Sequence, residues 1–73
     1  MNENTELLLK LSAALYSLGI RIEKIRRKVE EMVLRGCDYE SEELKQLVKE
    51  YKLLQCQFAS LEAQYQQVKE DSE

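Results

Sequence analysis

Hydrophobic residues recur along this chain at alternating spacings of three and four positions, in two separate ladders. The first ladder consists of Leu8, Leu11, Leu15, Leu18, Ile22, Ile25, Val29 and Met32, and the second of Leu44, Leu47, Tyr51, Leu54, Phe58, Leu61, Tyr65 and Val68. Steps of three and four are the a and d positions of a heptad repeat, which line one side of an α-helix. The pattern predicts two amphipathic helices that pack through these residues, which form the predicted hairpin core.

The break between the ladders, at residues 35–41, predicts a turn. Gly36 suits the position just after a helix, because glycine adopts the left-handed conformation without steric cost. Either Asp38 or Ser41 would cap the second helix by accepting hydrogen bonds from its first backbone N–H groups. The expected bounds are a first helix over residues 4–35, starting near Asn2, Asn4 or Thr5, a turn at 36–40, a second helix over 41–69 and a frayed tail at 70–73.

The two ladders also match each other about Asp38. With the chain folded there, Met32 faces Leu44 at one end and Leu8 faces Val68 at the other, and all eight layers are in register. A short connection favours antiparallel neighbours. The sequence therefore predicts an all-α fold, a single antiparallel two-helix hairpin of coiled-coil type that spans residues 1–73.

Apolar residues also fall outside the ladders. Residues 7–20 are apolar almost all round, and residues 53–63 carry a second stripe of small side chains. A hairpin covers one side of each helix, and a contiguous exposed apolar patch usually marks an interface. The alternative is that these residues only favour helix formation and pack the helix ends. Gly19 is either a weak point costing about 1 kcal/mol relative to alanine or a place where a partner comes close. The candidate partner-binding residues are Leu7, Leu9, Ala13, Tyr16, Ile20, Leu53, Cys56, Ala59 and Ala63.

Composition and charge narrow the class of protein. The chain has 73 residues, no proline and two glycines, which suits one small domain of long helices with a marginal core. The formal net charge of −3 weakly disfavours binding to nucleic acid or to anionic membranes. In the basic run at residues 21–28, Glu23 has helical ion-pair spacing to Arg26 and Arg27. This run is therefore interpreted as a solvated face in preference to an RNA-binding face.

Residues suited to catalysis or metal binding are few. Histidine is absent, and the cysteines Cys37 and Cys56 would lie about 27 Å apart along a helix, too far for a disulfide. We therefore expect free thiols, no enzymatic activity, no cofactor and no metal site. The chain lacks a run of 18 apolar residues and begins without a basic signal-peptide region. A cytoplasmic location without membrane insertion is expected.

Two segments resemble a known family. The segment IRRKVEEMVLRGCD at residues 25–38 and the segment EYKLLQCQFASLE at residues 50–62 resemble the small YscE/PscE-type (EscE-like) co-chaperones of bacterial type III secretion needles. Those proteins are short and helical, and their first long helix ends in a basic, apolar stretch followed by Arg-Gly. The resemblance implies a virulence-associated, cytoplasmic co-chaperone. It would bind and stabilise a tetratricopeptide-like chaperone that holds the needle subunit before export.

Two other hypotheses stay open beside the co-chaperone. In the first, the hairpin associates with a second copy of itself as a homodimeric four-helix bundle, with a structural or adaptor role. In the second, a hairpin dimer binds RNA through residues 21–28. The heteromer and the homodimer use the same apolar surplus, so the sequence does not separate them.

Overall fold

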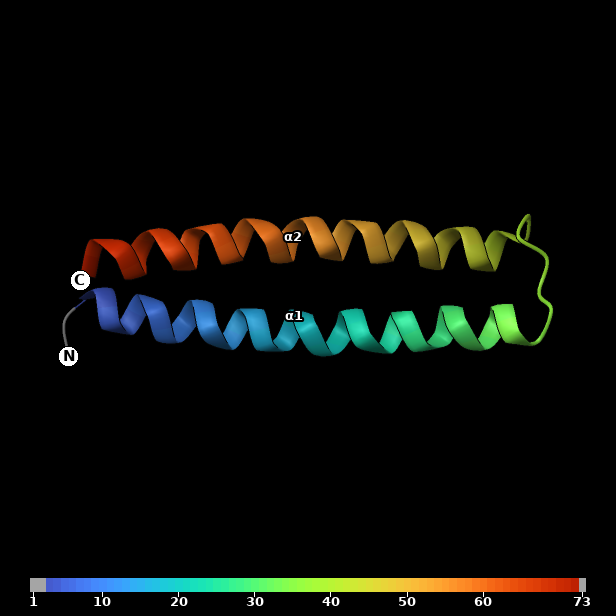
Figure 1. The fold of residues 1–73 in the computed structure, drawn as a ribbon, viewed down its shortest axis with the longest axis horizontal. Coiled ribbons are helices and arrows are strands. Elements are labelled where there is room, and N and C mark those ends of the chain that lie inside the picture. Colours follow the sequence, from blue (N-terminus) through green and yellow to red (C-terminus); the bar gives the residue numbers. More distant parts are fainter. Residues whose placement is uncertain (1–2, 73) are drawn as a thin grey trace.

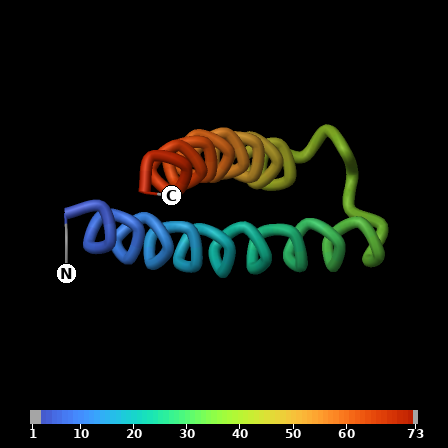
Figure 2. The backbone as a smooth tube through the Cα atoms, turned by 60° about the vertical axis from the view of Figure 1, so that its left-hand side comes forward, coloured from blue at the N-terminus to red at the C-terminus, as the bar shows by residue number. Residues whose placement is uncertain are grey.

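The chain folds into two long antiparallel helices, α1 (Glu3–Leu34) and α2 (Glu42–Ser72), joined by residues 35–41 (Figure 1). The structure is a computed structural model that describes residues 3–72. The described residues contain no strand, so the predicted all-α antiparallel hairpin is confirmed. A second view shows that the helix axes are inclined to each other, as they are in coiled-coil packing (Figure 2).

The two ladders of hydrophobic residues form the seam of the hairpin. All sixteen ladder residues are buried or half-buried. The most deeply buried are Leu11 and Leu18 on α1 and Leu44 and Leu54 on α2, and Leu54 retains only 2% of its exposure. Because these four side chains come from both helices and from several layers, the apolar core is thin and runs along the length of the molecule.

The turn begins with a motif that ends α1 at Leu34. Gly36 has a φ of 79°, the only positive φ among the described residues. Its N–H donates to the carbonyl of Val33 at 3.0 Å, and the N–H of Cys37 donates to the carbonyl of Met32 at 3.0 Å. These two bonds are the Schellman pattern, which satisfies carbonyls at the helix end and requires a left-handed residue. The prediction for Gly36 is confirmed.

The second half of the turn sets the start of α2. The Oγ of Ser41 accepts a hydrogen bond from the N–H of Leu44 at 3.3 Å, so Ser41 is the N-cap. Asp38 instead shapes the turn: its Oδ1 accepts from the N–H of Glu40, and its carbonyl accepts from the N–H of Ser41, each at 3.0 Å. Of the two candidate caps, Ser41 therefore caps α2, and the hydrogen bonds of Asp38 hold Ser41 in position.

The outer ends of the helices differ from the expected bounds. α1 begins at Glu3, before the candidate starts Asn4 and Thr5, and the acidic side chains of Glu3 and Glu6 suit the positive end of the helix. The third candidate, Asn2, lies outside the described residues. The frayed tail expected at 70–73 is wrong for residues 70–72, which belong to α2; residue 73 is outside the described part.

Side-chain hydrogen bonds explain why α2 continues past its last apolar residue. The Nε2 of Gln67 donates to Oδ1 of Asp71 at 3.3 Å, and the Oγ of Ser72 donates to the carbonyl of Val68 at 2.9 Å. Both bonds join residues one helical turn apart. They stabilise the last turn without burying apolar surface, so the pattern of hydrophobic residues gives no sign of them.

The hairpin exposes more surface than a compact protein of its mass. Its principal extents are 51 × 14 × 14 Å, and its accessible surface is 5697 Å². A compact monomer of 8.6 kDa is expected to expose roughly 4700 Å². The excess is therefore about 1000 Å², and it follows from a fold in which each helix has a single neighbour.

Replacement of Leu54 by alanine tests the seam. We expect Leu54→Ala to lower the free energy of unfolding by about 2–5 kcal/mol, because it opens a cavity at the most buried position. The adjacent Leu53 is 58% exposed, so Leu53→Ala is the matched control and should change stability by no more than about 0.5 kcal/mol. Urea unfolding followed by circular dichroism measures both. Equal losses would contradict the assignment of the seam.

Candidate functional site

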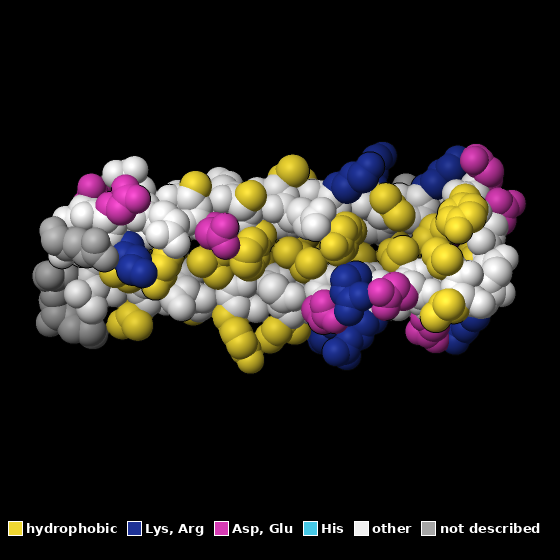
Figure 3. All heavy atoms as spheres, in the orientation of Figure 1, with side chains coloured by type: hydrophobic (Ala, Val, Ile, Leu, Met, Phe, Trp, Pro, Cys, Tyr) yellow, Lys and Arg dark blue, Asp and Glu magenta, His cyan; other side chains and the backbone are white. Residues whose placement is uncertain are grey.

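The nine candidate partner-binding residues all lie on the exposed surface of the hairpin. Tyr16 keeps 74% of its exposure and Leu9 keeps 56%. Figure 3 shows hydrophobic side chains along the outer edges of the molecule as well as along the line between the helices. The exposed candidates are Leu7, Leu9, Ala13, Tyr16 and Ile20 on α1 and Leu53, Cys56, Ala59 and Ala63 on α2. Nothing in the hairpin itself covers them.

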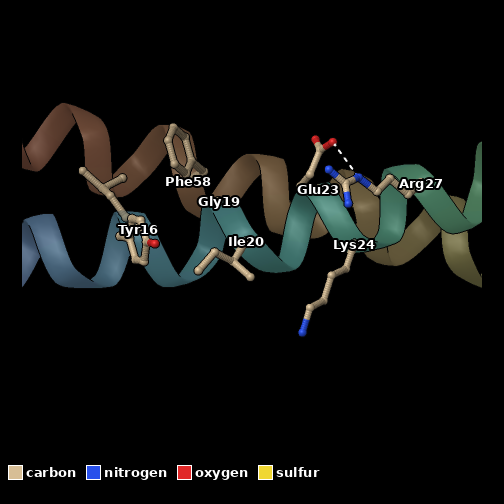
Figure 4. A pocket seen from close by; sticks show the side chains of 8 residues that line it. Tyr16, Gly19, Ile20, Glu23, Lys24, Arg27 and Phe58 are labelled. Atoms are coloured by element: carbon tan, nitrogen blue, oxygen red, sulfur yellow. Dashed lines mark hydrogen bonds and ion pairs between the residues drawn. The ribbon is translucent and has the colours of Figure 1, made fainter.

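A groove on α1 brings several of these residues together. Tyr16, Gly19 and Ile20 follow one another along α1, and the ring of Phe58 comes from α2 on the other side of α1 from Ile20 (Figure 4). The groove has a volume of about 590 Å³. We call it the Gly19 groove, and its lining residues are Leu15, Tyr16, Gly19, Ile20, Glu23, Lys24, Arg27 and Phe58. Apolar side chains form one end of it and charged side chains the other.

The charged end is organised by Glu23. Its carboxylate accepts two hydrogen bonds from Arg26, Oε2 from Nε at 2.9 Å and Oε1 from Nη2 at 2.5 Å. Its Oε1 also accepts a hydrogen bond from Nε of Arg27 at 3.3 Å. Arg26 reaches on to Glu30 at 2.5 Å. The two ion pairs predicted from spacing, Glu23–Arg26 and Glu23–Arg27, are therefore confirmed.

These contacts shift the proton affinity of Glu23. The hydrogen bond from Arg26, together with the positive charges of Arg26 and Arg27, lowers the pKa of Glu23 to about 2. The same hydrogen bond raises the pKa of Arg26 above its ordinary value. Glu23 is thus held ionised across the physiological range, and its charge is matched by Arg26 and Arg27.

Three cations of the basic run remain without an ion pair among the described residues. Arg21, Lys24 and Lys28 lie three and four positions apart, so they follow one ridge of α1, which we call the basic ridge. Lys24 borders the Gly19 groove and its side chain points away from the hairpin (Figure 4). The basic run is therefore divided between a neutralised part and an unpaired part.

The stripe on α2 has a different character. Leu53, Cys56, Ala59 and Ala63 are exposed, and three of them are small, so the surface there is shallow. Both cysteines are free, as the sequence predicts. Cys37 is half-buried in the turn, where its Sγ lies 3.6 Å from the Oγ of Ser41. The stripe offers contact area for another helix and no deep groove.

The sequence analysis missed an apolar cluster at the tip of the hairpin. Leu34 is 87% exposed and Tyr39 is 71% exposed, with Val33 beside them in the chain. A signal was present, because Val33 and Leu34 follow Met32 directly and so fall outside the ladder spacing. These residues lie at the turn end of the hairpin, and the charged run at residues 21–28 separates them along α1 from Tyr16.

Other kinds of site find no counterpart in residues 3–72. No group of three or more His, Cys, Asp or Glu side chains there is placed to hold a metal ion. Neither helix has a stretch apolar and long enough to cross a membrane. Comparison with protein-family models, with curated proteins and with solved structures finds no match to this chain.

The ion pairs of Glu23 predict an acid-dependent loss of stability. Because the pKa of Glu23 is about 2 in the folded chain and 4.5 in its ordinary state, its stabilising effect is present above pH 4.5 and is lost as the pH falls toward 2. Glu23→Gln should lower the melting temperature at pH 6 and reduce the further drop between pH 5 and 2. The side chain is exposed, so the effect should shrink in added salt.

Thermal melts by circular dichroism at several pH values measure this effect. Glu62→Gln is the control, because it removes an exposed carboxylate that makes no ion pair among the described residues. A melting curve of Glu23→Gln that follows the wild-type pH profile throughout would refute a structural role for the Glu23 ion pairs.

Proposed function

We propose that this chain is a cytoplasmic co-chaperone of a bacterial type III secretion system. In this role it binds and stabilises a tetratricopeptide-like chaperone, which holds the needle subunit before export. The observation that carries the proposal is that all nine candidate residues are exposed, because no other part of the hairpin packs over them. The identity of the partner rests on the resemblance of residues 25–38 and 50–62 to the YscE/PscE-type family.

The shape of the hairpin supports a helical-repeat partner. Repeat proteins stack helix pairs, and each repeat contacts only its neighbours, so the last repeat exposes the apolar face that the next one would cover. A separate helix pair with apolar residues outside its own seam is able to cover such a face. The hairpin has this form, since α1 and α2 are 32 and 31 residues long and both carry exposed apolar positions.

A homodimeric four-helix bundle is the alternative. It is favoured by the stripe on α2, because Ala59 and Ala63 allow a second helix to approach closely. A second copy of the chain would cover the excess exposed surface equally well. In that case the chain has a structural or adaptor role, and its melting temperature rises with its own concentration.

Recovery of the partner from the host bacterium tests the proposal. We expect affinity capture of the tagged full chain, followed by mass spectrometry, to recover a protein of helical repeats. Addition of that protein at about 100 times its dissociation constant should stabilise the hairpin by about 2.7 kcal/mol. Recovery of the chain alone, together with a concentration-dependent melt, would instead establish the homodimer.

Surface and seam substitutions should separate binding from folding. Tyr16→Asp and Ala59→Arg change exposed residues, so we expect helicity to stay close to wild type and partner binding to be lost. Leu18→Ala and Phe58→Ala remove seam side chains, at a cost of roughly 2–5 kcal/mol each, and should unfold the hairpin. Circular dichroism and the same capture assay measure both effects. Equal loss of helicity in the two pairs would show that the division between surface and seam is wrong.

A further inference from the structure

The side of α1 that faces away from α2 carries a second regular stripe of apolar residues. Leu9, Ala13, Tyr16 and Ile20 follow one another at steps of four, three and four, and we call them the outer stripe. All four are exposed, whereas the ladder residues between them are buried or half-buried. Figure 3 shows hydrophobic side chains along this outer edge of α1, and Figure 4 shows Ile20 and Lys24 projecting from it. The spacing is that of a heptad seam, so the outer stripe suits packing against another long helix.

Charged residues of opposite sign border the outer stripe at its two ends. Glu3 and Glu6 precede it in the first turn of α1, and Lys24 follows it. All three are exposed, and none has an ion pair among the described residues. Within the span of the stripe, residues 9–20, Lys10 is the one charged residue. A helix that matches this surface therefore has an apolar centre with a cation at one end and a carboxylate at the other.

A second copy of α1 has this arrangement when it runs antiparallel to the first. In the register that places Ala13 opposite Tyr16, Leu9 lies opposite Ile20, and the two-fold symmetry repeats both layers. The small side chain of Ala13 leaves room for the Tyr16 ring. A shift by one heptad in either direction would place an apolar residue of the stripe opposite a charged one. This register therefore keeps all four apolar layers matched.

The same register brings charges of opposite sign together. Glu3, Lys10, Ser17 and Lys24 are each one heptad apart, so they lie along one flank of the outer stripe. A two-fold axis between antiparallel helices keeps this flank on the same side in both copies. Glu3 of each copy then lies beside Lys24 of the other, and Lys10 lies beside the uncharged Ser17. Parallel packing would instead place each of these charges beside its own copy.

One layer of this register brings two carboxylates together, because Glu6 lies opposite Glu23 of the other copy. The charge of Glu23 is already matched, since its carboxylate accepts hydrogen bonds from Nε of Arg26 at 2.9 Å and from Nε of Arg27 at 3.3 Å. Lys24 follows Glu23 directly and has no ion pair among the described residues. Glu6 therefore meets a neutralised carboxylate beside an unpaired lysine.

We propose that the free chain forms an antiparallel homodimer through the outer stripe of α1, with α2 of each copy on the outside. The surface excess of about 1000 Å² per chain is similar to the roughly 800 Å² that each partner loses in a typical protein interface. The stripe on α2 would bury less apolar surface, because three of its four candidate residues are small. The inference goes beyond the co-chaperone proposal and does not depend on it, since it needs no second protein.

Sedimentation equilibrium of the full-length chain tests whether the dimer forms. We expect twice the chain mass of 8.6 kDa at high concentration and the single mass on dilution. Isotope-filtered NMR on a mixture of labelled and unlabelled chain tests the register. It should detect contacts between the Ala13 methyl group of one copy and the Tyr16 ring of the other, because only the proposed register places these two side chains in the same layer.

Charge reversal tests the contact between Glu3 and Lys24. Glu3→Lys and Lys24→Glu each turn both symmetric pairs into like charges, so each should weaken the dimer about tenfold. The double variant restores opposite charges at the wild-type net charge and should return the dissociation constant to within about threefold of wild type. Lys49→Glu makes the same change of charge on exposed α2 and should leave the dissociation constant unchanged. Circular dichroism checks that every variant keeps its helicity, and added salt should reduce the effects.

Three results would overturn the inference. They are a chain that stays monomeric at about 1 mM, contacts between copies that involve the α2 stripe instead of the outer stripe, and a double variant that dimerises as weakly as the single ones. The inference and the co-chaperone proposal fail separately. A monomeric chain that captures a repeat protein keeps the co-chaperone and removes this dimer. A dimer with the Ala13–Tyr16 contacts that captures no repeat protein keeps the dimer and removes the co-chaperone.

Discussion

The dominant constraint on this fold is that each helix has one neighbour. A helix in a two-helix hairpin buries a single side, and its remaining sides face solvent whatever residues they carry. As a consequence, only Leu11, Leu18, Leu44 and Leu54 are buried among the described residues, each with 2–8% of its surface still exposed, and the accessible surface is 5697 Å². Polar residues on the outer sides would suit such a fold. This chain places Tyr16, Leu34 and Leu53 there instead.

Because the core is small, interactions between residues close together in the sequence also shape the helices and the turn. The Schellman bonds at Gly36, the cap by Ser41 and the side-chain bond from Gln67 to Asp71 all join residues within five positions of each other. The ion pairs of Glu23 have the same short range. Exposed ion pairs of this kind contribute little individually. They fix the ends and one face of the helices, whereas the seam fixes how the two helices pair.

The parts of the structure that follow from sequence are those set by regular spacing. The ladder steps predicted the helices and their pairing, and the requirement for a left-handed residue predicted the role of Gly36. Asp38 and Ser41 are equally good caps, so only the geometry of the turn distinguishes them. The Gly19 groove could not be predicted from the sequence, because one of its lining residues, Phe58, lies on α2 and reaches the groove only when the hairpin folds.

The groove also ties the surface to the core. Leu15 and Phe58 belong to the seam and at the same time form the floor of the Gly19 groove. A side chain that fills the groove would therefore bury the exposed edges of these two core residues and pack against both helices. By mass action, whatever binds there also stabilises the pairing of α1 with α2, and whatever weakens the pairing weakens binding. Gly19, which costs helix stability relative to alanine, thus leaves this edge of the seam, between Leu15 and Phe58, open to solvent.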